Sequence, residues 1–221
     1  ETTQKCLESY LDCLENDYIL ELIIFDNKSD TDMINYLKTF ETKNKKIKIL
    51  FNEKNIGVCH GRIKLFEKAK GDIICSLDSD AKLLDKSFFN TIIEKLYDEK
   101  YGIIGISGAY INNWNFGEQQ DINNDDGNEY YCHHISGCCQ VFRRDLFHFG
   151  FGLDEKYGFF WCEDTDLSFQ SMYLNKINYR INGNNLIEHK WGGSGEKHHD
   201  LFIKNWKYLK DKWKNKFLNI R

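Results

Sequence analysis

The sequence predicts an α/β fold with a mostly parallel, twisted sheet flanked by helices. Over the first 107 residues, short apolar runs with the length of buried strands alternate with helical patterns. Alternation of this kind typically builds a parallel sheet with helices on both faces. The chain has 221 residues, 41% hydrophobic and 15% aromatic, which is enough for one sizeable globular domain.

The first half starts with a helical pattern in which Leu7, Leu11 and Leu14 share one stripe. Strands are predicted at residues 21–25, 47–51, 73–77 and 102–107. Helices are predicted between them, around residues 33–40, 63–69 and 88–96, and Asp85 is a candidate N-cap for the last helix.

The alternation breaks in the second half. Residues 112–128 are rich in Asn, Asp, Gln and Gly and predict a long surface loop. The remaining predictions are a strand pair at 130–136 and 139–142, helices at 143–149 and 163–175, and short strands at 177–181 and 186–188. Residues 200–221 predict an amphipathic helix, because aromatic and leucine residues recur there at helical spacing.

Charge and cysteine usage limit the class of protein. The net charge is −4 with both signs interspersed, so composition does not indicate a nucleic-acid partner. The eight cysteines form no Cys-x-x-Cys motif, and we interpret them as reduced residues of a cytoplasmic protein. The sequence contains no signal-peptide pattern and no apolar run of membrane-spanning length.

A first acidic group, Asp78 and Asp80, follows the predicted strand at residues 73–77. Strand ends are where open α/β sheets bind their ligands. Two carboxylates this close repel each other, and a divalent cation that also holds phosphate oxygens would relieve the repulsion. Asp and Ser are also common in ordinary turns, so this group alone leaves the turn interpretation open.

A second acidic group, Glu163, Asp164 and Asp166, opens a predicted helix after an aromatic run. Acidic residues in a first helical turn also complement the helix dipole, so this group has a structural explanation as well. His189 follows, before the glycine-rich residues 192–195. Two acidic groups followed by a histidine form a sparse pattern, which favours a functional site.

In this combination the chain resembles the family 2 glycosyltransferases, which have the GT-A fold. The matching segments are Asp26-Asn27-Lys28-Ser29-Asp30, Asn55-Ile56-Gly57 with Arg62, residues 69–80 ending in Asp-x-Asp, Phe151-Gly152-Leu153-Asp154-Glu155, and Glu163-Asp164-x-Asp166-Leu167. Together they cover nearly the whole chain in order. The resemblance implies a large nucleotide-binding sheet, a smaller acceptor-side sheet and transfer of a sugar from a nucleotide donor.

The resemblance also implies roles for individual residues. On the donor side, Asp26 would bind the base, usually uracil, Arg62 the base or diphosphate, and Asp78 would lie near the ribose. Asp80 and His189 would ligate Mn²⁺ or Mg²⁺. On the acceptor side, Asp164 would be the general base of an inverting reaction and Glu163 would position the acceptor.

We therefore expect a single domain, residues 1–221, with a nucleotide-sugar half (1–107), an acceptor-side half (108–199) and a C-terminal helix (200–221). The expected partners are a UDP-sugar donor and a glycan, lipid-linked or protein acceptor, in glycan or polysaccharide synthesis. Two departures from the family are expected to matter. The family's first strand is missing, which would leave unpaired backbone on its neighbours, and Gln170 stands where the family commonly has Arg.

Several alternatives remain open. The chain could be a non-catalytic, degenerate sugar-nucleotide or glycan-binding domain, or a phosphatase with Asp78 as nucleophile, although Lys82 does not fit the phosphatase pattern. Cys132-His133-His134 with Cys138-Cys139 could suggest zinc, but the spacing matches no common structural site. The basic face of the last helix is a solvated surface or a contact with an anionic membrane surface.

Overall fold

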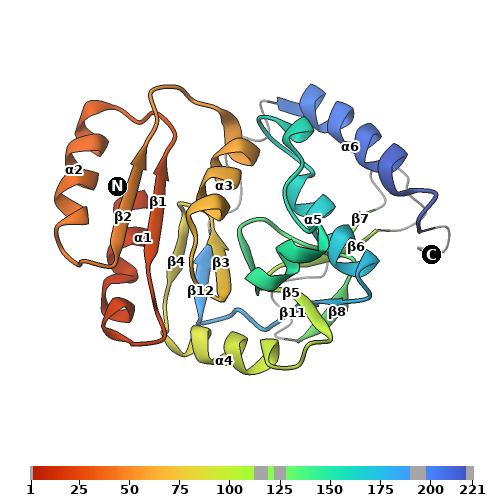
Figure 1. Ribbon diagram of the computed structural model, residues 1–221, viewed down its shortest axis with the longest axis horizontal. Coiled ribbons are helices and arrows are strands. Elements are labelled where there is room, and N and C mark those ends of the chain that lie inside the picture. Colours follow the sequence, from red (N-terminus) through yellow and green to blue (C-terminus); the bar gives the residue numbers. More distant parts are fainter. Residues whose placement is uncertain (1, 112–118, 122–127, 190–197, 218–221) are drawn as a thin grey trace.

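The computed structural model describes residues 2–111, 119–121, 128–189 and 198–217. Strands β1 and β2 lie with α1 and α2 on one side of the molecule, and a larger group of strands lies on the other side, with α5 and α6 over it (Figure 1). Helix α3 stands between the two groups. This arrangement confirms the predicted α/β class.

The helices are α1 (Thr2–Ser9), α2 (Thr31–Glu41), α3 (Gly57–Lys68), α4 (Ser87–Leu96), α5 (Glu163–Tyr173) and α6 (His199–Trp213), with 3₁₀ helices at Leu11–Glu15, Arg144–Phe149 and Glu155–Tyr157. The strands are β1 (Leu22–Asp26), β2 (Ile47–Phe51), β3 (Ile73–Leu77), β4 (Ala81–Leu83), β5 (Tyr101–Gly105), β6 (Gly108–Ile111), β7 (Gln119–Asp121), β8 (Tyr130–Cys132), β9 (His134–Ile135), β10 (Cys139–Arg143), β11 (Ile177–Arg180) and β12 (Ile187–His189).

The described strands form a mixed arrangement rather than one mostly parallel sheet. The largest sheet has the order β3-β10-β5-β11-β8. Strand β10 runs antiparallel to both β3 and β5, whereas β5 and β11 are parallel. Strands β1 and β2 form a separate parallel pair, and β4 pairs antiparallel with β12.

Three local predictions need correction. The segments at 130–136 and 139–142 are strands, but they do not pair with each other: β8 pairs with β11, β9 with β6, and β10 with β3 and β5. The predicted loop 112–128 contains strand β7, which pairs with β6, while residues 112–118 and 122–127 lie outside the described residues. The N-cap of α4 is Lys86, although the side chain of Asp85 accepts a hydrogen bond from Ser87 N.

A cavity of about 1280 Å³ lies between β1 and β3. Within the described residues, β1 is bonded only to β2, and β3 only to β10. Apolar side chains of both strands, including Ile24 and Ile74, are among the residues that line the cavity. Asp26, Arg62 and Asp78 also line it, so the cavity adjoins the polar residues that the sequence singles out.

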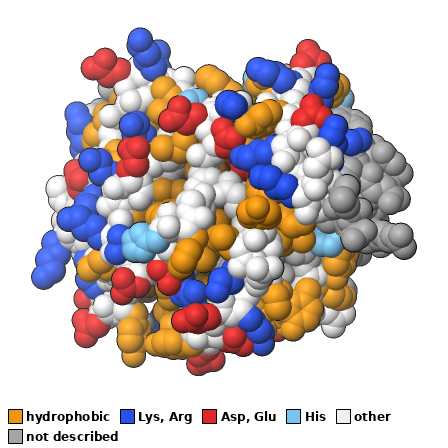
Figure 2. Space-filling view, turned by 45° about the vertical axis from the view of Figure 1, so that its right-hand side comes forward, with side chains coloured by type: hydrophobic (Ala, Val, Ile, Leu, Met, Phe, Trp, Pro, Cys, Tyr) orange, Lys and Arg blue, Asp and Glu red, His pale blue; other side chains and the backbone are white. Residues whose placement is uncertain are grey.

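Helix α6 packs its apolar side onto the rest of the fold. Trp206, Leu209 and Trp213 are buried in a cluster that includes Phe169 of α5. No helix among the described residues is long and apolar enough to cross a membrane. The face in Figure 2 carries acidic and basic side chains interspersed, as the composition indicates.

Candidate functional site

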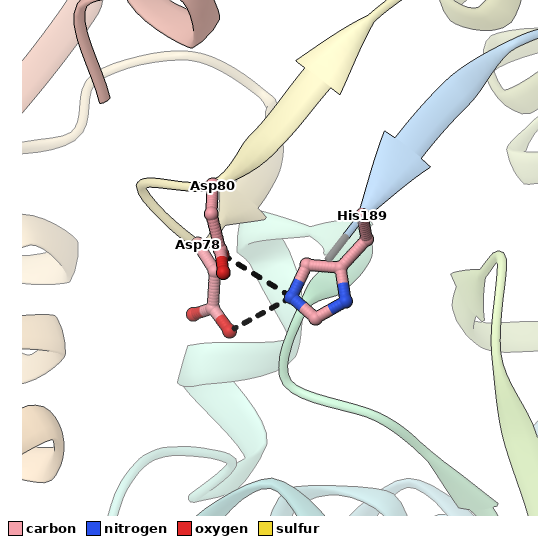
Figure 3. A group of neighbouring side chains, drawn as sticks. All are labelled: Asp78, Asp80 and His189. Atoms are coloured by element: carbon pink, nitrogen blue, oxygen red, sulfur yellow. Dashed lines mark ion pairs between the residues drawn. The ribbon is translucent and has the colours of Figure 1, made fainter. Parts of the chain in front are cut away.

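The first acidic group forms where two short strands meet. The chain leaves β3 at Leu77, passes Asp78 and Asp80, and continues into β4. Strand β12 pairs antiparallel with β4, and this register puts His189 opposite Ala81. The imidazole Nε2 therefore lies 3.2 Å from Asp80 Oδ1 and 3.9 Å from Asp78 Oδ2 (Figure 3).

These three side chains can hold a divalent cation. One ligand atom from each of Asp78, Asp80 and His189 lies within 4.8 Å of the others, and all three side chains are partly exposed. Two carboxylates and one imidazole suit Mn²⁺ or Mg²⁺, which favour oxygen ligands and accept phosphate oxygens as further ligands. The structure thus brings together the two predicted metal ligands, Asp80 and His189, and adds Asp78 to them.

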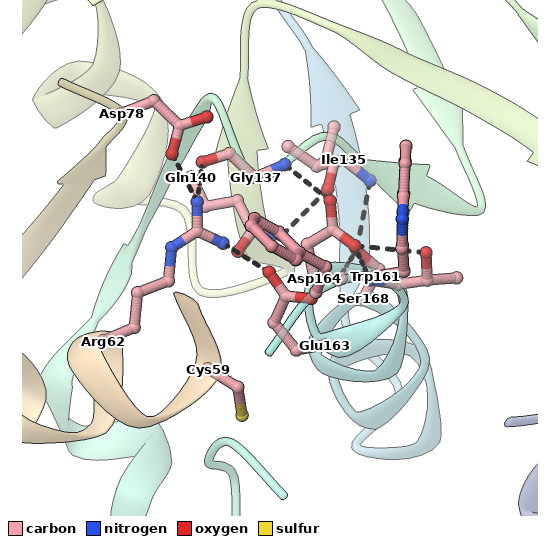
Figure 4. A network of polar contacts seen from close by, with 12 residues as sticks. Cys59, Arg62, Asp78, Ile135, Gly137, Gln140, Trp161, Glu163, Asp164 and Ser168 are labelled. Atoms are coloured by element: carbon pink, nitrogen blue, oxygen red, sulfur yellow. Dashed lines mark hydrogen bonds and ion pairs between the residues drawn. The ribbon is translucent and has the colours of Figure 1, made fainter. Parts of the chain in front are cut away.

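Arg62 connects the two acidic groups (Figure 4). Its guanidinium donates to Asp78 Oδ1 at 2.6 Å, to Gly137 O at 2.7 Å and to Glu163 Oε1 at 3.1 Å. Burial alone would lower the pKa of Arg62, but Asp78 and Glu163 raise it, so the side chain stays charged. This buried cation lets three carboxylates, including Asp164, lie close together.

Glu163 is the first residue of α5 and is 5% exposed. Its Oε1 accepts from Arg62, whereas its buried Oε2 has no hydrogen-bond partner among the described residues. Burial raises the pKa of Glu163 to about 7; the charge of Asp164 adds to this shift and Arg62 opposes it. Glu163 can therefore exist in either protonation state near neutral pH.

Asp164, the predicted base, is held in place from two sides. Its Oδ2 accepts from Gly137 N at 2.8 Å and its Oδ1 from Thr165 N at 2.7 Å. The buried amide of Gln140 donates to the main-chain oxygen of Asp164 at 3.1 Å. The carboxylate is partly exposed and fixed in orientation, as a group that must take a proton from a bound molecule would need to be.

Asp26 lies at the end of β1 and is 4% exposed. Both of its carboxylate oxygens accept from Ser29 N, at 3.2 and 3.3 Å. It lines the cavity together with Arg62 and Asp78, so the three predicted nucleotide-binding residues border one space. The glycine-rich residues 192–195, which follow His189, lie outside the described residues.

The structure also identifies residues to which sequence reasoning assigned no role. Asp166 is fully buried and accepts hydrogen bonds from Tyr157, Gln170, Lys212 and Trp213. Two of these donors come from α6, which is far along the chain, so no local pattern could reveal them. The amide nitrogen of Gln170 donates to Asp166 and to Gly152 O, so this side chain supports the helix that carries Asp164.

The zinc alternative gains no support from the described residues. His133 Nδ1 lies 3.2 Å from Ile111 O, and His134 Nδ1 lies 3.2 Å from the hydroxyl of Thr165. Among the described residues, Asp78, Asp80 and His189 form the one group of three or more side chains suited to a metal ion.

Comparison with known proteins identifies the family of the chain. The family model of glycosyl transferase family 2 matches residues 1–151, which is more than half of the chain. The chain belongs to glycosyl transferase family 2. A curated relative, an uncharacterized glycosyltransferase from Haemophilus influenzae, is 36% identical over 74 residues, covering 33% of this chain and 30% of the relative.

Solved structures of glycosyltransferases have the same fold. GalNAc-T7 with UDP, GalNAc and Mn²⁺ has a TM-score of 0.78 at 12% identity, covering 99% of this chain and 47% of that one. The mannosyltransferase PcManGT from Pyrobaculum calidifontis, in complex with GDP-Man and Mn²⁺, has a TM-score of 0.64 at 14% identity, covering 86% and 54%. TarS from S. aureus with UDP-GlcNAc has a TM-score of 0.69 at 12% identity, covering 99% and 64%.

These likenesses confirm the expected GT-A fold for this family 2 chain. The match covers 30% of the Haemophilus relative and 47% of GalNAc-T7, so this chain spans less than half the length of either protein. What those larger proteins bind or transfer is therefore a property of those proteins.

Proposed function

We propose that this family 2 chain is a metal-dependent, inverting glycosyltransferase that moves a sugar from a UDP-sugar to an acceptor hydroxyl. The observation that carries the proposal is the junction at Arg62. One guanidinium contacts Asp78 of the candidate metal group and Glu163 beside the candidate base. A donor diphosphate and an acceptor hydroxyl would thus be held on either side of the same buried cation.

The donor half of the proposal rests on Asp80, His189 and Asp78 as the holders of Mn²⁺ or Mg²⁺. The bound ion would neutralise the negative charge that develops on the leaving diphosphate. Asp26 and Arg62 border the cavity next to this group and are the proposed nucleotide-binding residues. UDP is favoured because GalNAc-T7 was solved with UDP and TarS with UDP-GlcNAc, although PcManGT was solved with GDP-Man.

The acceptor half rests on Asp164. In an inverting transfer, the acceptor oxygen bonds to the anomeric carbon while the bond from that carbon to the phosphate oxygen breaks. The diphosphate leaves with the electron pair, and the hydroxyl proton goes to the Asp164 carboxylate. Thr165 N and Gly137 N orient that carboxylate, and Glu163 lies beside it to position the acceptor.

In this proposal, residues 1–107 form the nucleotide-sugar half, 108–199 the acceptor half, and 200–221 the C-terminal helix. The acceptor would be a glycan, a lipid-linked or a protein hydroxyl in glycan or polysaccharide synthesis. All eight cysteines are free, which supports a cytoplasmic location. Lys204, Lys207, Lys214 and Lys216 are exposed and would provide any contact with an anionic membrane surface.

Calorimetric titration with UDP, GDP and dTDP, each with and without Mn²⁺, tests the donor half. We expect UDP to bind only with Mn²⁺, and Asp80→Ala to abolish that binding. Asp98→Ala, which removes an exposed carboxylate in the turn after α4, is the matched control and should bind as the unchanged chain does. Binding of none of the three nucleotides would contradict the proposal.

Asp164→Asn tests the acceptor half and separates an enzyme from a non-catalytic binding domain. The amide keeps the shape of the side chain but cannot take the proton. We expect transfer to fall by about 10²–10⁴-fold while UDP binding is retained. Transfer at an unchanged rate would exclude Asp164 as the base.

A further inference from the structure

The loop that leads into α5 has an unusual backbone next to the proposed base. Trp161 and Cys162 are consecutive non-glycine residues with left-handed backbone conformation, at φ values of 78° and 72°. This conformation favours glycine, because a Cβ atom crowds the neighbouring carbonyl oxygen. Cys162 is buried, but Trp161 is 39% exposed, so burial in the core does not account for an indole at this position.

Two other elements hold this loop in place. Asn205 of α6, only 3% exposed, donates its amide protons to the carbonyl oxygens of Tyr157, Phe160 and Trp161, at 2.8, 2.7 and 3.2 Å. On the other side, Val58 N at the start of α3 donates to Phe159 O at 2.8 Å. A strained backbone that its surroundings fix this firmly is typical of functional sites.

The fixed loop exposes two aromatic side chains, Phe159 and Trp161, and we call the exposed indole of Trp161 the aromatic shelf. The indole packs edge-on against Phe202 of α6, with ring centroids 5.3 Å apart. That contact anchors one part of the indole and leaves the rest exposed, and Phe159 is 43% exposed. Phe202 is in turn tilted against Trp206, which is buried, so the shelf has a rigid support.

The aromatic shelf lies beside the acidic pair. Trp161 is two residues before Glu163 and three before Asp164, and Figure 4 draws its side chain together with theirs. A pyranose ring has one face of C–H groups and a rim of hydroxyls. A rigid indole next to oriented carboxylates matches both parts, because binding sites commonly combine aromatic walls with a few placed polar groups.

We propose that Trp161 is a specificity-determining residue on which a pyranose ring of the acceptor stacks. This inference rests on the proposed function and narrows its acceptor to a saccharide. Stacking would hold the ring so that one hydroxyl points to Asp164, and the gain would come from orientation of the acceptor. Asn205 is the positioning residue, since it keeps the loop in the conformation that exposes the indole.

The test compares Trp161→Gly and Trp161→Phe with the unchanged chain. Glycine suits a φ of 78° and removes the ring together with its contact to Phe202, whereas phenylalanine keeps an aromatic face. Binding of methyl β-glucoside and methyl β-N-acetylglucosaminide is measured by saturation-transfer NMR, with glycerol as a hydroxyl-bearing molecule without a ring. Tyr97→Ala, at an aromatic residue that is 81% exposed after α4, is the control variant.

We expect Trp161→Gly to weaken pyranoside binding about tenfold and Trp161→Phe to weaken it less. Trp161→Gly loses the contact with Phe202 but relieves the left-handed backbone, so its melting temperature should change little. Its affinity for UDP with Mn²⁺ should equal that of the unchanged chain. The proposal would be overturned if Trp161→Gly bound the pyranosides as tightly as the unchanged chain does. It would also be overturned if Tyr97→Ala lost pyranoside binding as well, or if glycerol bound as tightly as the pyranosides.

The two proposals fail in different ways. If pyranosides bind to the unchanged chain and more weakly to Trp161→Gly, but no sugar is transferred from any UDP-sugar, the saccharide subsite is supported and the proposed reaction is excluded. If transfer occurs and Trp161→Gly leaves the KM for a saccharide acceptor unchanged, the proposed reaction is supported and the subsite at Trp161 is excluded. A tenfold rise in that KM with little change in kcat supports both.

Discussion

Arg62 on α3 donates a hydrogen bond to Glu163 on α5 across 3.1 Å, and both side chains are buried. The same guanidinium contacts Asp78 at 2.6 Å. Helices from the two halves of the chain thus meet at one cation, which lies between the candidate metal group and the candidate base. Removing that cation should affect both stability and function.

Arg62→Ala should destabilise the protein by about 3–5 kcal/mol, because it leaves Glu163 buried without its positive partner. Urea unfolding followed by circular dichroism measures this loss. Arg144→Ala is the matched control: Arg144 is exposed, and its side chain donates to Gly71 O. We expect a change within about 0.5 kcal/mol for the control. If Arg62→Ala and Arg144→Ala lost the same free energy of unfolding, the buried pair of Arg62 and Glu163 would contribute nothing to stability.

Glu163 should make stability fall as pH rises. Burial raises its folded-state pKa to about 7, above the ordinary value of 4.5. The folded state therefore binds more protons than the unfolded state between these pH values. The contribution of Glu163 to the free energy of unfolding is fully present below pH 4.5 and is lost as the pH rises through 7.

Glu163→Gln removes this titration while keeping a side chain of similar shape. We expect its melting temperature, relative to that of the unchanged chain, to rise by a few degrees between pH 5 and pH 8. Differential scanning calorimetry across that range measures the difference. Glu155→Gln, at an exposed residue in the 3₁₀ helix Glu155–Tyr157, is the control. Its melting temperature should differ from that of the unchanged chain by the same amount at every pH. If the melting temperatures of Glu163→Gln and the unchanged chain differ by the same amount at pH 5 and pH 8, the raised pKa of Glu163 is contradicted.

Asp166 should couple α6 to α5, the helix that carries the proposed base. Its Oδ1 accepts from Trp213 at 2.6 Å and its Oδ2 from Lys212 at 2.9 Å. Asp166→Ala leaves these donors without their carboxylate, so we expect a loss of about 3 kcal/mol and faster proteolytic cleavage within α6. Asp211→Ala breaks only an exposed pair with Lys214 and should change neither measurement. Unaltered cleavage in Asp166→Ala would contradict the coupling.

Parts of this architecture could be predicted because their signals are local. The strands Ile47–Phe51 and Ile73–Leu77 are predicted with the bounds that the structure gives, since a short, largely apolar run marks a strand. The acidic residues beside Ile73–Leu77 were found from their position at a strand end. Residue type and spacing were sufficient there.

Other parts depend on contacts that no local pattern records. Strand β4 has three residues, Ala81–Leu83, and exists because it pairs with β12 far along the chain. That pairing is also what brings His189 to Asp80. The sequence suggested a nucleotide contact for Arg62, but its bond to Glu163 follows from how α3 and α5 pack. The sequence identified the residues of the site more readily than their partners.

Gly57 should be indispensable to the position of the loop that carries Phe159 and Trp161. Its φ is 83°, and a Cβ atom there would lie 2.4 Å from the Cα atom of Phe159, which is main chain and cannot rotate away. Gly57→Ala must therefore shift either α3 or the loop that carries Trp161. We expect a loss of about 2 kcal/mol or more, since both the backbone conformation and the contact are unfavourable.

Gly152→Ala is the matched control for this variant. Gly152 does not have a positive φ, and a Cβ atom there would meet nothing within 4 Å. Urea unfolding should show a loss for Gly57→Ala and a change within about 0.5 kcal/mol for Gly152→Ala. Because the loop leads directly into Glu163 and Asp164, Gly57→Ala should also reduce transfer more than it reduces UDP binding. Full stability and transfer in Gly57→Ala would mean that the loop can move away from α3 without consequence for the site.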